Sequence, residues 1–410
     1  DGVCCDNVCN DPCMACNVPG IEGTCAETSP GACSSTWCSG LAGFPGLPAV
    51  TIGGSPSDVD MADFNGDGKS DLVVGGTDAG GVEVLFNNGN GTFTSQGNYQ
   101  MGGREISLAT ADLNGDRKAD IVTANRDMGT VSVRLNNGLG VFIVNTDYAA
   151  GTYPQSVKLA DLTGDGKPEI ITANAGSGRV SVLRNLGNGT FGAKAEYGDG
   201  HDVASVALAD FNGDGSRDMV VTGPGYLKAR VFFNQGNGLF GAPALVSLPN
   251  VANMVDAADF DGDGKPEIIV TDFARVVVLH NNGNGTFDAG TSYATSIQAV
   301  PFDVTTTDVN GDGKLDLLAA SGGVEIHVNN GNGTFAAPVR YSSGDAPFYI
   351  AAADVSGDGK TDIAVLNRVD GMIDMLLNQG DGTFPTRPGL IERSIGYAAK
   401  IGRASCRERV

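Results

Sequence analysis

Basic residues are scarce in this sequence. Lys and Arg number 26 against 48 Asp and Glu, and the formal net charge is −22. A chain this acidic has no basic stripe with which to neutralise phosphates, so we expect no nucleic-acid partner and no adsorption to anionic membranes. Long apolar runs are also missing. None approaches the roughly 18 residues that a membrane-spanning helix needs, so we expect no membrane insertion.

Residues suited to catalysis are few. The chain has three His and one Trp. His280 and His327 stand in strand-like runs and are interpreted as exposed side chains. His201 lies in a loop, where a solvated histidine is a simpler interpretation than a general acid or base. The sequence therefore predicts a protein without enzymatic activity.

Cysteine is confined to the start of the chain, apart from Cys406. A dense, even set of eight in a short Gly- and Pro-rich stretch predicts four disulfides and an oxidising, extracytoplasmic compartment. A zinc site is the alternative, because Cys13 and Cys16 form a CxxC pair, but no His lies nearby. The pairing stays open among Cys4, Cys5, Cys9, Cys13, Cys16, Cys25, Cys33 and Cys38.

The composition divides the chain into three parts. We expect a Cys-rich module over residues 1–40, a repeat domain over 41–397 and a tail over 398–410. Residues 401–410 resemble a translated sequencing adapter and are left out of the fold prediction. The chain begins at Asp1 rather than Met, so we expect an export signal to have been removed or left unsequenced, and the natural gene to continue beyond the tail.

One nine-residue motif occurs seven times and predicts the architecture. Successive copies begin 49 residues apart, except for a last interval of 46, and a fixed period of this length is typical of solenoids, propellers and arrays. The copies begin at Asp63, Asp112, Asp161, Asp210, Asp259, Asp308 and Asp354. Gly-rich turns keep the same period and end at Phe93, Phe142, Phe191, Phe240, Phe287, Phe335 and Phe384.

Each repeat contains four short strand-like runs, which in the first repeat are 59–64, 71–75, 82–87 and 92–100. Alternating apolar residues bounded by Gly and Asn predict strands joined by tight turns. Four antiparallel strands repeated seven times predict an all-β, seven-bladed propeller, because radial closure leaves few exposed edges. An open solenoid is the alternative.

Closure of the ring needs one more outer strand for the last blade. The segments 44–54 and 384–396 are both candidates, because each stands where an outer strand would stand relative to a neighbouring repeat. We expect one of them to complete the blade. Having both also leaves room for an eighth repeat.

The nine-residue loop has the donor pattern of a calcium site. Positions 1, 3, 5 and 9 hold oxygen side chains in every copy, position 7 offers its backbone carbonyl, and glycines at 4 and 6 let the chain curl in all but one copy. Ca²⁺ takes about six to eight oxygen ligands, and the loops lack the His and Cys that zinc, copper and iron prefer.

We predict up to seven calcium ions, one per blade. The predicted ligands are Asp63, Asn65, Asp67, Lys69, Asp71, Asp112, Asn114, Asp116, Lys118, Asp120, Asp161, Thr163, Asp165, Lys167, Glu169, Asp210, Asn212, Asp214, Ser216, Asp218, Asp259, Asp261, Asp263, Lys265, Glu267, Asp308, Asn310, Asp312, Lys314, Asp316, Asp354, Ser356, Asp358, Lys360 and Asp362.

An Asx-turn without metal would explain a single copy of this loop, but not seven with acids at the same offsets. The loops hold 22 of the 48 acids, and several carboxylates in one loop repel each other unless a cation is bound. The sites are not expected to be equal. Arg117 replaces Gly at position 6 of the second loop, so that site is expected to be weak.

The motif D-x-[DN]-G-D-G-x-x-[DE], followed by a strand and an NGDGTF-like turn, resembles the FG-GAP/VCBS repeat family over about residues 44–396. The resemblance implies a propeller similar to that of integrin α subunits, with calcium in the loop between the first two strands of each blade. It also implies a secreted or cell-surface protein. It does not imply one activity, because such propellers occur in adhesins, lectins and a few polysaccharide-active enzymes.

The expected strand order places the metal loops and the Gly-rich turns on one face of the ring, and the remaining loops on the other. Aromatic side chains on such loops suit stacking on sugars or peptides, although packing beneath the loops is the alternative. We predict an extracellular glycan or protein ligand bound by Tyr153, His201, Tyr226, Phe273, Phe348 and Tyr349. The alternative functions are a carbohydrate-active enzyme, such as a polysaccharide lyase or hydrolase, and a structural spacer of a larger surface protein.

Overall fold

The computed structural model describes residues 14–16, 25–27, 49–52, 55–76, 81–102, 105–295, 301–344 and 346–384. The chain forms two compact units, residues 1–46 and 47–410. In the first unit, β1 (Met14–Cys16) and β2 (Cys25–Glu27) pair as an antiparallel hairpin. The other six cysteines of this unit lie outside the described residues, so the disulfides stay a prediction.

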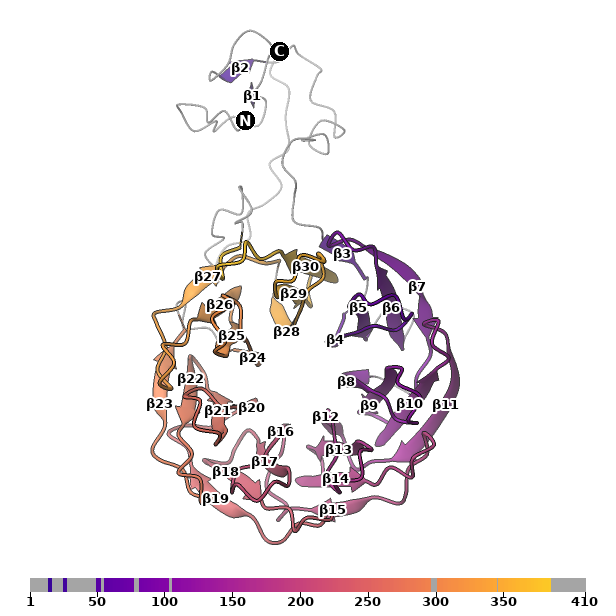
Figure 1. The fold of residues 1–410 in the computed structure, drawn as a ribbon, viewed down its shortest axis with the longest axis vertical. Helices are drawn as coiled ribbons and strands as arrows, with labels where there is room; N and C mark the ends of the chain where they lie inside the picture. The colour runs from indigo at the N-terminus through magenta and orange to yellow at the C-terminus, as the bar shows by residue number, and fades with distance from the viewer. Residues whose placement is uncertain are drawn as a thin grey trace, which may run out of the picture. The chain divides into compact units, whose positions relative to one another are not determined.

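The second unit is a ring of seven four-stranded antiparallel sheets, the blades, each with its first strand innermost (Figure 1). This arrangement confirms the predicted all-β, seven-bladed propeller, and no helix occurs among the described residues. The strands of blades one to four are β4 (Asp58–Ala62), β5 (Asp71–Gly75), β6 (Val82–Asn87), β7 (Phe93–Tyr99), β8 (Glu105–Ala111), β9 (Asp120–Asn125), β10 (Thr130–Asn136), β11 (Phe142–Ala149), β12 (Pro154–Ala160), β13 (Glu169–Asn174), β14 (Arg179–Leu183), β15 (Ala195–Tyr197), β16 (Ser205–Ala209), β17 (Asp218–Thr222), β18 (Lys228–Phe232) and β19 (Ala244–Ser247).

Blades five to seven continue the pattern. Their strands are β20 (Val255–Ala258), β21 (Glu267–Thr271), β22 (Arg275–Leu279), β23 (Thr291–Ala294), β24 (Val304–Thr307), β25 (Asp316–Ala320), β26 (Val324–His327), β27 (Val339–Tyr341), β28 (Pro347–Ala353), β29 (Asp362–Asn367), β30 (Met372–Leu376) and, as the outer strand of blade seven, β3 (Ala49–Thr51).

The ring is closed by a strand from the beginning of the propeller. β3 pairs antiparallel with β30, and Val50 lies opposite Ile373. The segment 44–54 therefore supplies the closing strand, which was one of the two predicted possibilities. The other segment, 384–396, lies outside the described residues apart from Phe384.

The hydrophobic core lies between neighbouring blades rather than at one centre. Every residue of the second strand is buried in each blade, because both faces of the sheet are covered. Between blades one and two, Phe64 packs edge-to-face against Phe142 with ring centroids 5.6 Å apart, and Leu108 and Ile121 belong to the same cluster. Each interface thus buries apolar side chains of two repeats, which makes a single repeat unable to fold alone.

A buried asparagine joins each blade to the blade before it. Asn136 donates from Nδ2 to the carbonyl oxygens of Phe64 (2.8 Å) and Ala119 (3.1 Å). The last link closes the ring, because Asn87 donates to Val355 O across 268 residues of sequence. The seven equivalent residues are Asn87, Asn136, Asn185, Asn234, Asn281, Asn329 and Asn378.

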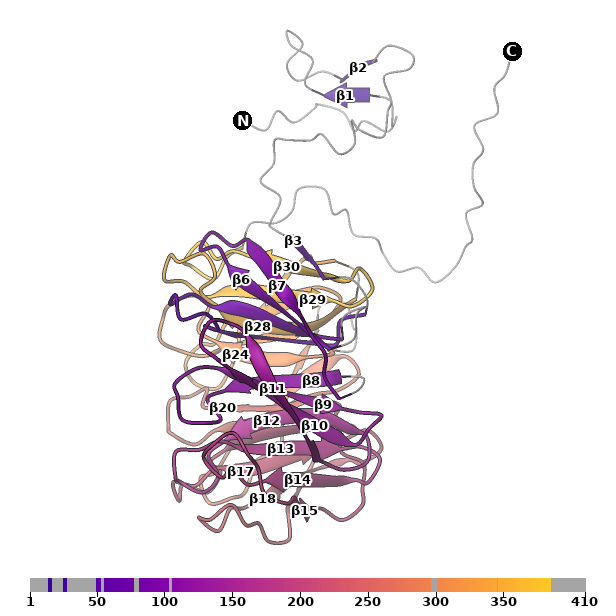
Figure 2. The same ribbon diagram turned by 90° about the vertical axis from the view of Figure 1, so that its right-hand side faces the viewer.

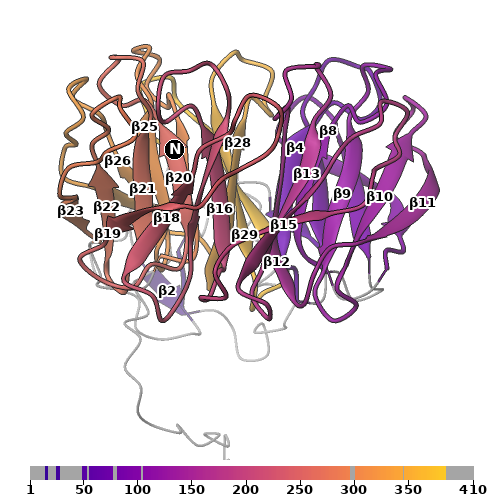
Figure 3. The same ribbon diagram turned by 90° about the horizontal axis from the view of Figure 1, so that it is seen from below.

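The strands cross the ring from one face to the other, and the connections gather at the two faces (Figures 2 and 3). We call the face with the nine-residue loops and the Gly-rich turns the loop face. The face with the connections between second and third strands and between blades is called the opposite face. This division matches the one expected from the strand order.

Candidate functional site

Each nine-residue loop is wrapped around its first carboxylate. In blade one, Asp63 Oδ1 accepts the N–H of Gly66 (2.7 Å) and of Asp67 (3.2 Å), and Oδ2 accepts the N–H of Gly68 (2.9 Å). Gly66 and Gly68 have φ of 80° and 83°, a backbone conformation that residues with a Cβ rarely adopt. The curl therefore depends on glycine at these two positions.

The same hydrogen bond from position 6 to position 1 occurs in all seven loops. The pairs are Gly68–Asp63, Arg117–Asp112, Gly166–Asp161, Gly215–Asp210, Gly264–Asp259, Gly313–Asp308 and Gly359–Asp354. Arg117 keeps the bond at 2.6 Å with φ of 65°, so the second loop has the same shape at the cost of a strained residue.

The carboxylate at position 9 fastens the loop to the blade. Asp71 is fully buried, and its two oxygens accept the N–H groups of Phe64 (3.0 Å) and Asn87 (2.8 Å). Burial raises the pKa of the equivalent Asp120 and Asp218 to about 6. Position 9 was predicted only as a metal ligand, and this second role was not. The Asn that recurs at or just after the end of each third strand was a visible signal of it.

The loops have the donor chemistry that calcium requires. Their side chains offer oxygen atoms, and in the fifth loop carboxylate oxygens of Asp259, Asp261 and Asp263 lie within 4.8 Å of one another. A positive charge already stands beside position 5 in blade one, where Lys69 Nζ is 3.0 Å from Asp67 Oδ2. The loop residues therefore fit a hard divalent cation, which would supply the charge that clustered carboxylates need.

Two of the predicted ligand-binding residues lie against each other on the opposite face. The rings of His201 and Tyr226 are stacked, with centroids 4.2 Å apart and an interplanar angle of 9°. Arg230 lies over the Tyr226 ring, with Cζ 5.5 Å from the centroid. We call these three residues the His201–Tyr226–Arg230 cluster.

Arg230 of β18 holds this cluster in place through hydrogen bonds. The side chain is fully buried and donates to Asp199 Oδ1 (2.6 Å), His201 O (3.0 Å) and Asp202 O (2.7 Å). Partial burial by itself would raise the pKa of Asp199, but the Arg230 hydrogen bond lowers it. A buried guanidinium thus holds the inter-blade loop that carries His201, which leaves the stacked rings pre-ordered.

The remaining predicted ligand residues lie away from this cluster, and only Phe348 and Tyr349 are in contact, with ring centroids 5.2 Å apart. Arg126 lies over Tyr153, with 5.7 Å from Cζ to the centroid. Phe348 stacks on Phe302 at 4.9 Å, and Arg368 lies 4.9 Å over the Phe348 ring. Phe273 is 56% exposed in the turn between β21 and β22, and Tyr349 lines the central channel. The structure therefore divides the six residues among several sites.

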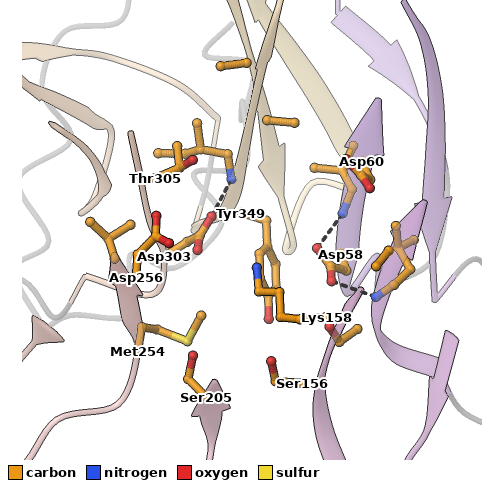
Figure 4. A pocket seen from close by; sticks show the side chains of 18 of the residues that line it. Asp58, Asp60, Ser156, Lys158, Ser205, Met254, Asp256, Asp303, Thr305 and Tyr349 are labelled. Atoms are coloured by element: carbon orange, nitrogen blue, oxygen red, sulfur yellow. Dashed lines mark hydrogen bonds between the residues drawn. The ribbon is translucent and has the colours of Figure 1, made fainter. Parts of the chain in front are cut away.

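The central channel is a feature that the sequence analysis did not identify. A cavity of about 440 Å³ is lined by the innermost strands of the blades, and four carboxylates and one lysine reach into it (Figure 4). The carboxylates are those of Asp58, Asp60, Asp256 and Asp303, and the lysine is Lys158. A signal was present in the sequence, because these residues belong to two series with the 49-residue period. Asp58 and Asp303 belong to the series 58, 107, 156, 205, 254 and 303, and Asp60, Lys158 and Asp256 stand two residues further on in their repeats.

The electrostatics of the channel follow from confinement. Burial raises the pKa of Asp58 and of Asp303 to about 7. Burial alone would lower the pKa of Lys158, but the carboxylates led by Asp256 raise it. Burial also raises the pKa of Tyr349 well above its ordinary value. The channel is thus a polar interior with more acids than bases.

His327 is not exposed, so that prediction was wrong. The side chain is fully buried at the end of β26, opposite Leu317 of β25. Neither ring nitrogen has a hydrogen-bond partner, and burial lowers the pKa of His327 to about 4. The neighbouring blade covers this side chain, because Tyr293 lies edge-on at 6.2 Å, and a strand pattern read within one repeat does not include that neighbour. His280, by contrast, is 46% exposed.

Similar solved structures share the propeller fold. A lectin of Agrocybe aegerita, described by its specific recognition of non-reducing terminal N-acetylglucosamine, is 26% identical, with a TM-score of 0.54 over 68% of this chain and 78% of that chain. BBS1N in complex with ARL6DN, soaked with mercury, is 13% identical, with a TM-score of 0.60 over 80% of this chain and 93% of that chain. The second likeness shows the fold alone.

No curated protein matches the chain. Among the described residues, none form a helix with the length and apolar character needed to span a bilayer. A model of the FG-GAP-like repeat matches residues 63–123, 112–172, 161–221, 210–270, 259–319 and 308–365, which together cover more than half of the sequence. The chain therefore belongs to the FG-GAP-like repeat family.

Proposed function

We propose that this protein is a secreted or cell-surface propeller, stabilised by up to seven calcium ions, that binds a glycan on its opposite face. The observation that carries the proposal is the stacked pair of His201 and Tyr226, held in place by the buried Arg230. Binding residues concentrate on loops that a rigid scaffold positions, and aromatic rings with polar tips suit the mixed surface of a sugar.

The glycan is favoured over a protein ligand by one comparison. The Agrocybe aegerita lectin, at 26% identity, has the same fold and recognises terminal N-acetylglucosamine. Asp199 and Asp202 are exposed residues of the loop that carries His201, and both accept hydrogen bonds from Arg230. Their remaining carboxylate oxygens offer acceptors for sugar hydroxyl groups. Secretion is supported by the Cys-rich beginning of the chain, since disulfides form in oxidising compartments.

Calcium is proposed for the loops because the seven copies repeat the same oxygen-rich geometry. Its role in this proposal is to stabilise the scaffold, not to contact the ligand. The metal loops lie on the loop face, whereas the His201–Tyr226–Arg230 cluster lies at connections of the opposite face. Calcium removal would then abolish ligand binding only through loss of the fold.

The test is glycan-array binding by the purified full-length chain, in calcium and in chelator. We expect a defined glycan set to bind in calcium, and Tyr226→Ala to lose that binding because half of the stacked pair is removed. The matched control is Ile143→Ala, which removes an exposed apolar side chain on the outer strand β11.

A blank array from a folded, calcium-stabilised protein would overturn glycan binding and leave a protein ligand or a spacer role. Release of products from a polysaccharide would replace the binding function by an enzymatic one. Equal binding by Tyr226→Ala and the unmodified chain would move the site away from this cluster.

A further inference from the structure

A histidine beside the fifth nine-residue loop supplies a nitrogen donor that has no counterpart at the other six loops. His280 directly precedes Asn281, the buried asparagine of blade five. The equivalent residues in the other blades are Phe86, Leu135, Arg184, Phe233, Val328 and Leu377, which bring no nitrogen that can ligate a metal as imidazole does. The fifth loop is also the one with Asp, rather than Asn, Thr or Ser, at position 3, namely Asp261.

The tertiary structure brings this histidine to two carboxylates of the loop. His280 Nδ1 lies 3.5 Å from Asp261 Oδ2 and 3.3 Å from Glu267 Oε1, and all three donor atoms lie within 4.8 Å of one another. N–H···O hydrogen bonds are about 2.7–3.2 Å long, so these separations are longer than good hydrogen bonds. Donors about 2.0–2.2 Å from one tetrahedral ion lie roughly 3.3–3.6 Å apart, which matches the two distances from His280.

The donor atoms are available for a ligand. Asp261 uses Oδ1 to accept the N–H of Asp263, which leaves Oδ2 toward His280. Glu267 uses Oε2 to accept the N–H of Phe260 at 2.9 Å, whereas Oε1 is 3.5 Å from the nearest donated N–H, that of Asn281. In blade one the equivalent bond, from Asn87 N to Asp71 Oδ1, is 2.8 Å. The longer glutamate thus holds Oε1 less firmly to the backbone.

The three residues differ in burial, so the site is closed on one side and open to solvent on the other. Glu267 is almost fully buried, Asp261 is 19% exposed and His280 is 46% exposed. An ion can therefore enter past the imidazole and reach the buried carboxylate. The two carboxylates balance the charge of one divalent cation.

We propose that Asp261, Glu267 and His280 form a binding site for a first-row transition-metal ion of the Zn²⁺ class. Imidazole nitrogen suits zinc, copper and nickel, whereas oxygen-only sites suit calcium and magnesium. Three protein ligands leave a fourth position for water. Because Asp261 and Glu267 also belong to the loop's oxygen set, Ca²⁺ and Zn²⁺ compete for the fifth loop. The proposal does not depend on calcium in the other six loops or on glycan binding.

The experiment titrates the full-length, chelator-stripped chain with Zn²⁺ and with Co²⁺, each in millimolar calcium and in calcium-free buffer. Co²⁺ is used because its visible spectrum reports the donor atoms. We compare the unmodified chain with His280→Phe, which installs the residue that blades one and four carry at this position. His201→Ala is the matched control, because it removes another exposed histidine away from the loop. The difference spectrum between chain and variant isolates this site from the cysteines of the N-terminal unit.

We expect one Zn²⁺ per chain to be lost, or its affinity to fall at least about tenfold, in His280→Phe and not in His201→Ala. Asp261→Asn, which restores the residue of loops one, two, four and six, should also weaken zinc while preserving stabilisation by calcium. Equal zinc binding and equal cobalt spectra in the chain and His280→Phe would overturn the proposal. So would failure of saturating zinc to bind both in millimolar calcium and in calcium-free buffer.

Discussion

Asp58 accepts a hydrogen bond from the backbone N–H of Leu108 at 2.8 Å, and this contact joins the innermost strands of blades one and two. Asp303 joins blades six and seven in the same way, through the N–H of Ile350 at 3.0 Å. Ser107 makes the equivalent contact between blades two and three without a charge. Two blade junctions around the channel therefore depend on a buried carboxylate, which makes them sensitive to pH.

The first prediction concerns Asp303 and pH. The folded-state pKa of about 7 lies above the ordinary value of 3.8, so the folded chain binds this proton more tightly than the unfolded chain. The resulting stabilisation is complete below about pH 4 and is lost as pH rises through 7. Asp303→Asn has no proton to lose, so its stability relative to the unmodified chain should rise by about 3 kcal/mol between pH 5 and pH 8.

The measurement is the midpoint of chemical unfolding at pH 5 and pH 8, in saturating calcium. Asp288→Asn, at an exposed acid of the outer part of blade five, is the control and should follow the unmodified chain at both pH values. A constant difference between Asp303→Asn and the unmodified chain across this range would contradict the prediction.

Calcium removal should destabilise the propeller strongly. Each of the seven loops contains three or more carboxylates within nine residues, and ions bound only to the folded chain stabilise it by mass action. We expect excess chelator to lower the melting temperature by about 10 °C or more, and added calcium, but not the same concentration of magnesium, to restore it. An unchanged melting temperature in excess chelator would show that calcium does not stabilise the propeller.

The second loop should become more stable when its strained residue is replaced. Arg117 has φ of 65°, where a Cβ costs about 1 kcal/mol, so Arg117→Gly should raise the free energy of unfolding by that amount. The reciprocal change is Gly166→Ala in the third loop, where φ is 79° and a Cβ would meet no atom within 4 Å. It should lower the free energy of unfolding by a similar amount. Denaturant unfolding checks both variants, and changes of the same sign would contradict the prediction.

Replacing the buried histidine should stabilise the chain, most of all in acid. The pKa of His327 is about 4 in the folded chain against 6.5 ordinarily, because burial disfavours the charged form, so stability falls as pH drops from 6.5 toward 4. His327→Leu restores the residue that Leu85 and Leu376 represent at this register. We expect a gain of about 1 kcal/mol at pH 7.5 and roughly 3 kcal/mol at pH 5.

Unfolding at the two pH values checks this prediction, with His201→Ala as the exposed-histidine control. A gain that is the same at pH 5 and pH 7.5 would mean that the buried imidazole is not responsible for the acid sensitivity.

The blades and their strands were predictable because the signals are local. In the first repeat the predicted runs 71–75 and 82–87 coincide with β5 and β6, since alternating apolar residues and Gly-rich turns act within a few residues of sequence. The closing strand was predictable only as a choice between two segments. Pairing of β3 with β30 joins Val50 to Ile373, and no local pattern encodes so distant a partner.

The sequence by itself determined the period, the strand order and the oxygen-rich loops, because each depends on residue patterns within a repeat. Only the tertiary structure decided which groups far apart in the sequence meet. Arg230 donates to the His201 carbonyl oxygen, several acids surround Lys158, and Tyr293 of the neighbouring blade packs against the buried His327. The physical reason is that burial and charge depend on the neighbouring blade. A residue that faces solvent in an isolated repeat becomes core, channel or binding surface once the ring has closed.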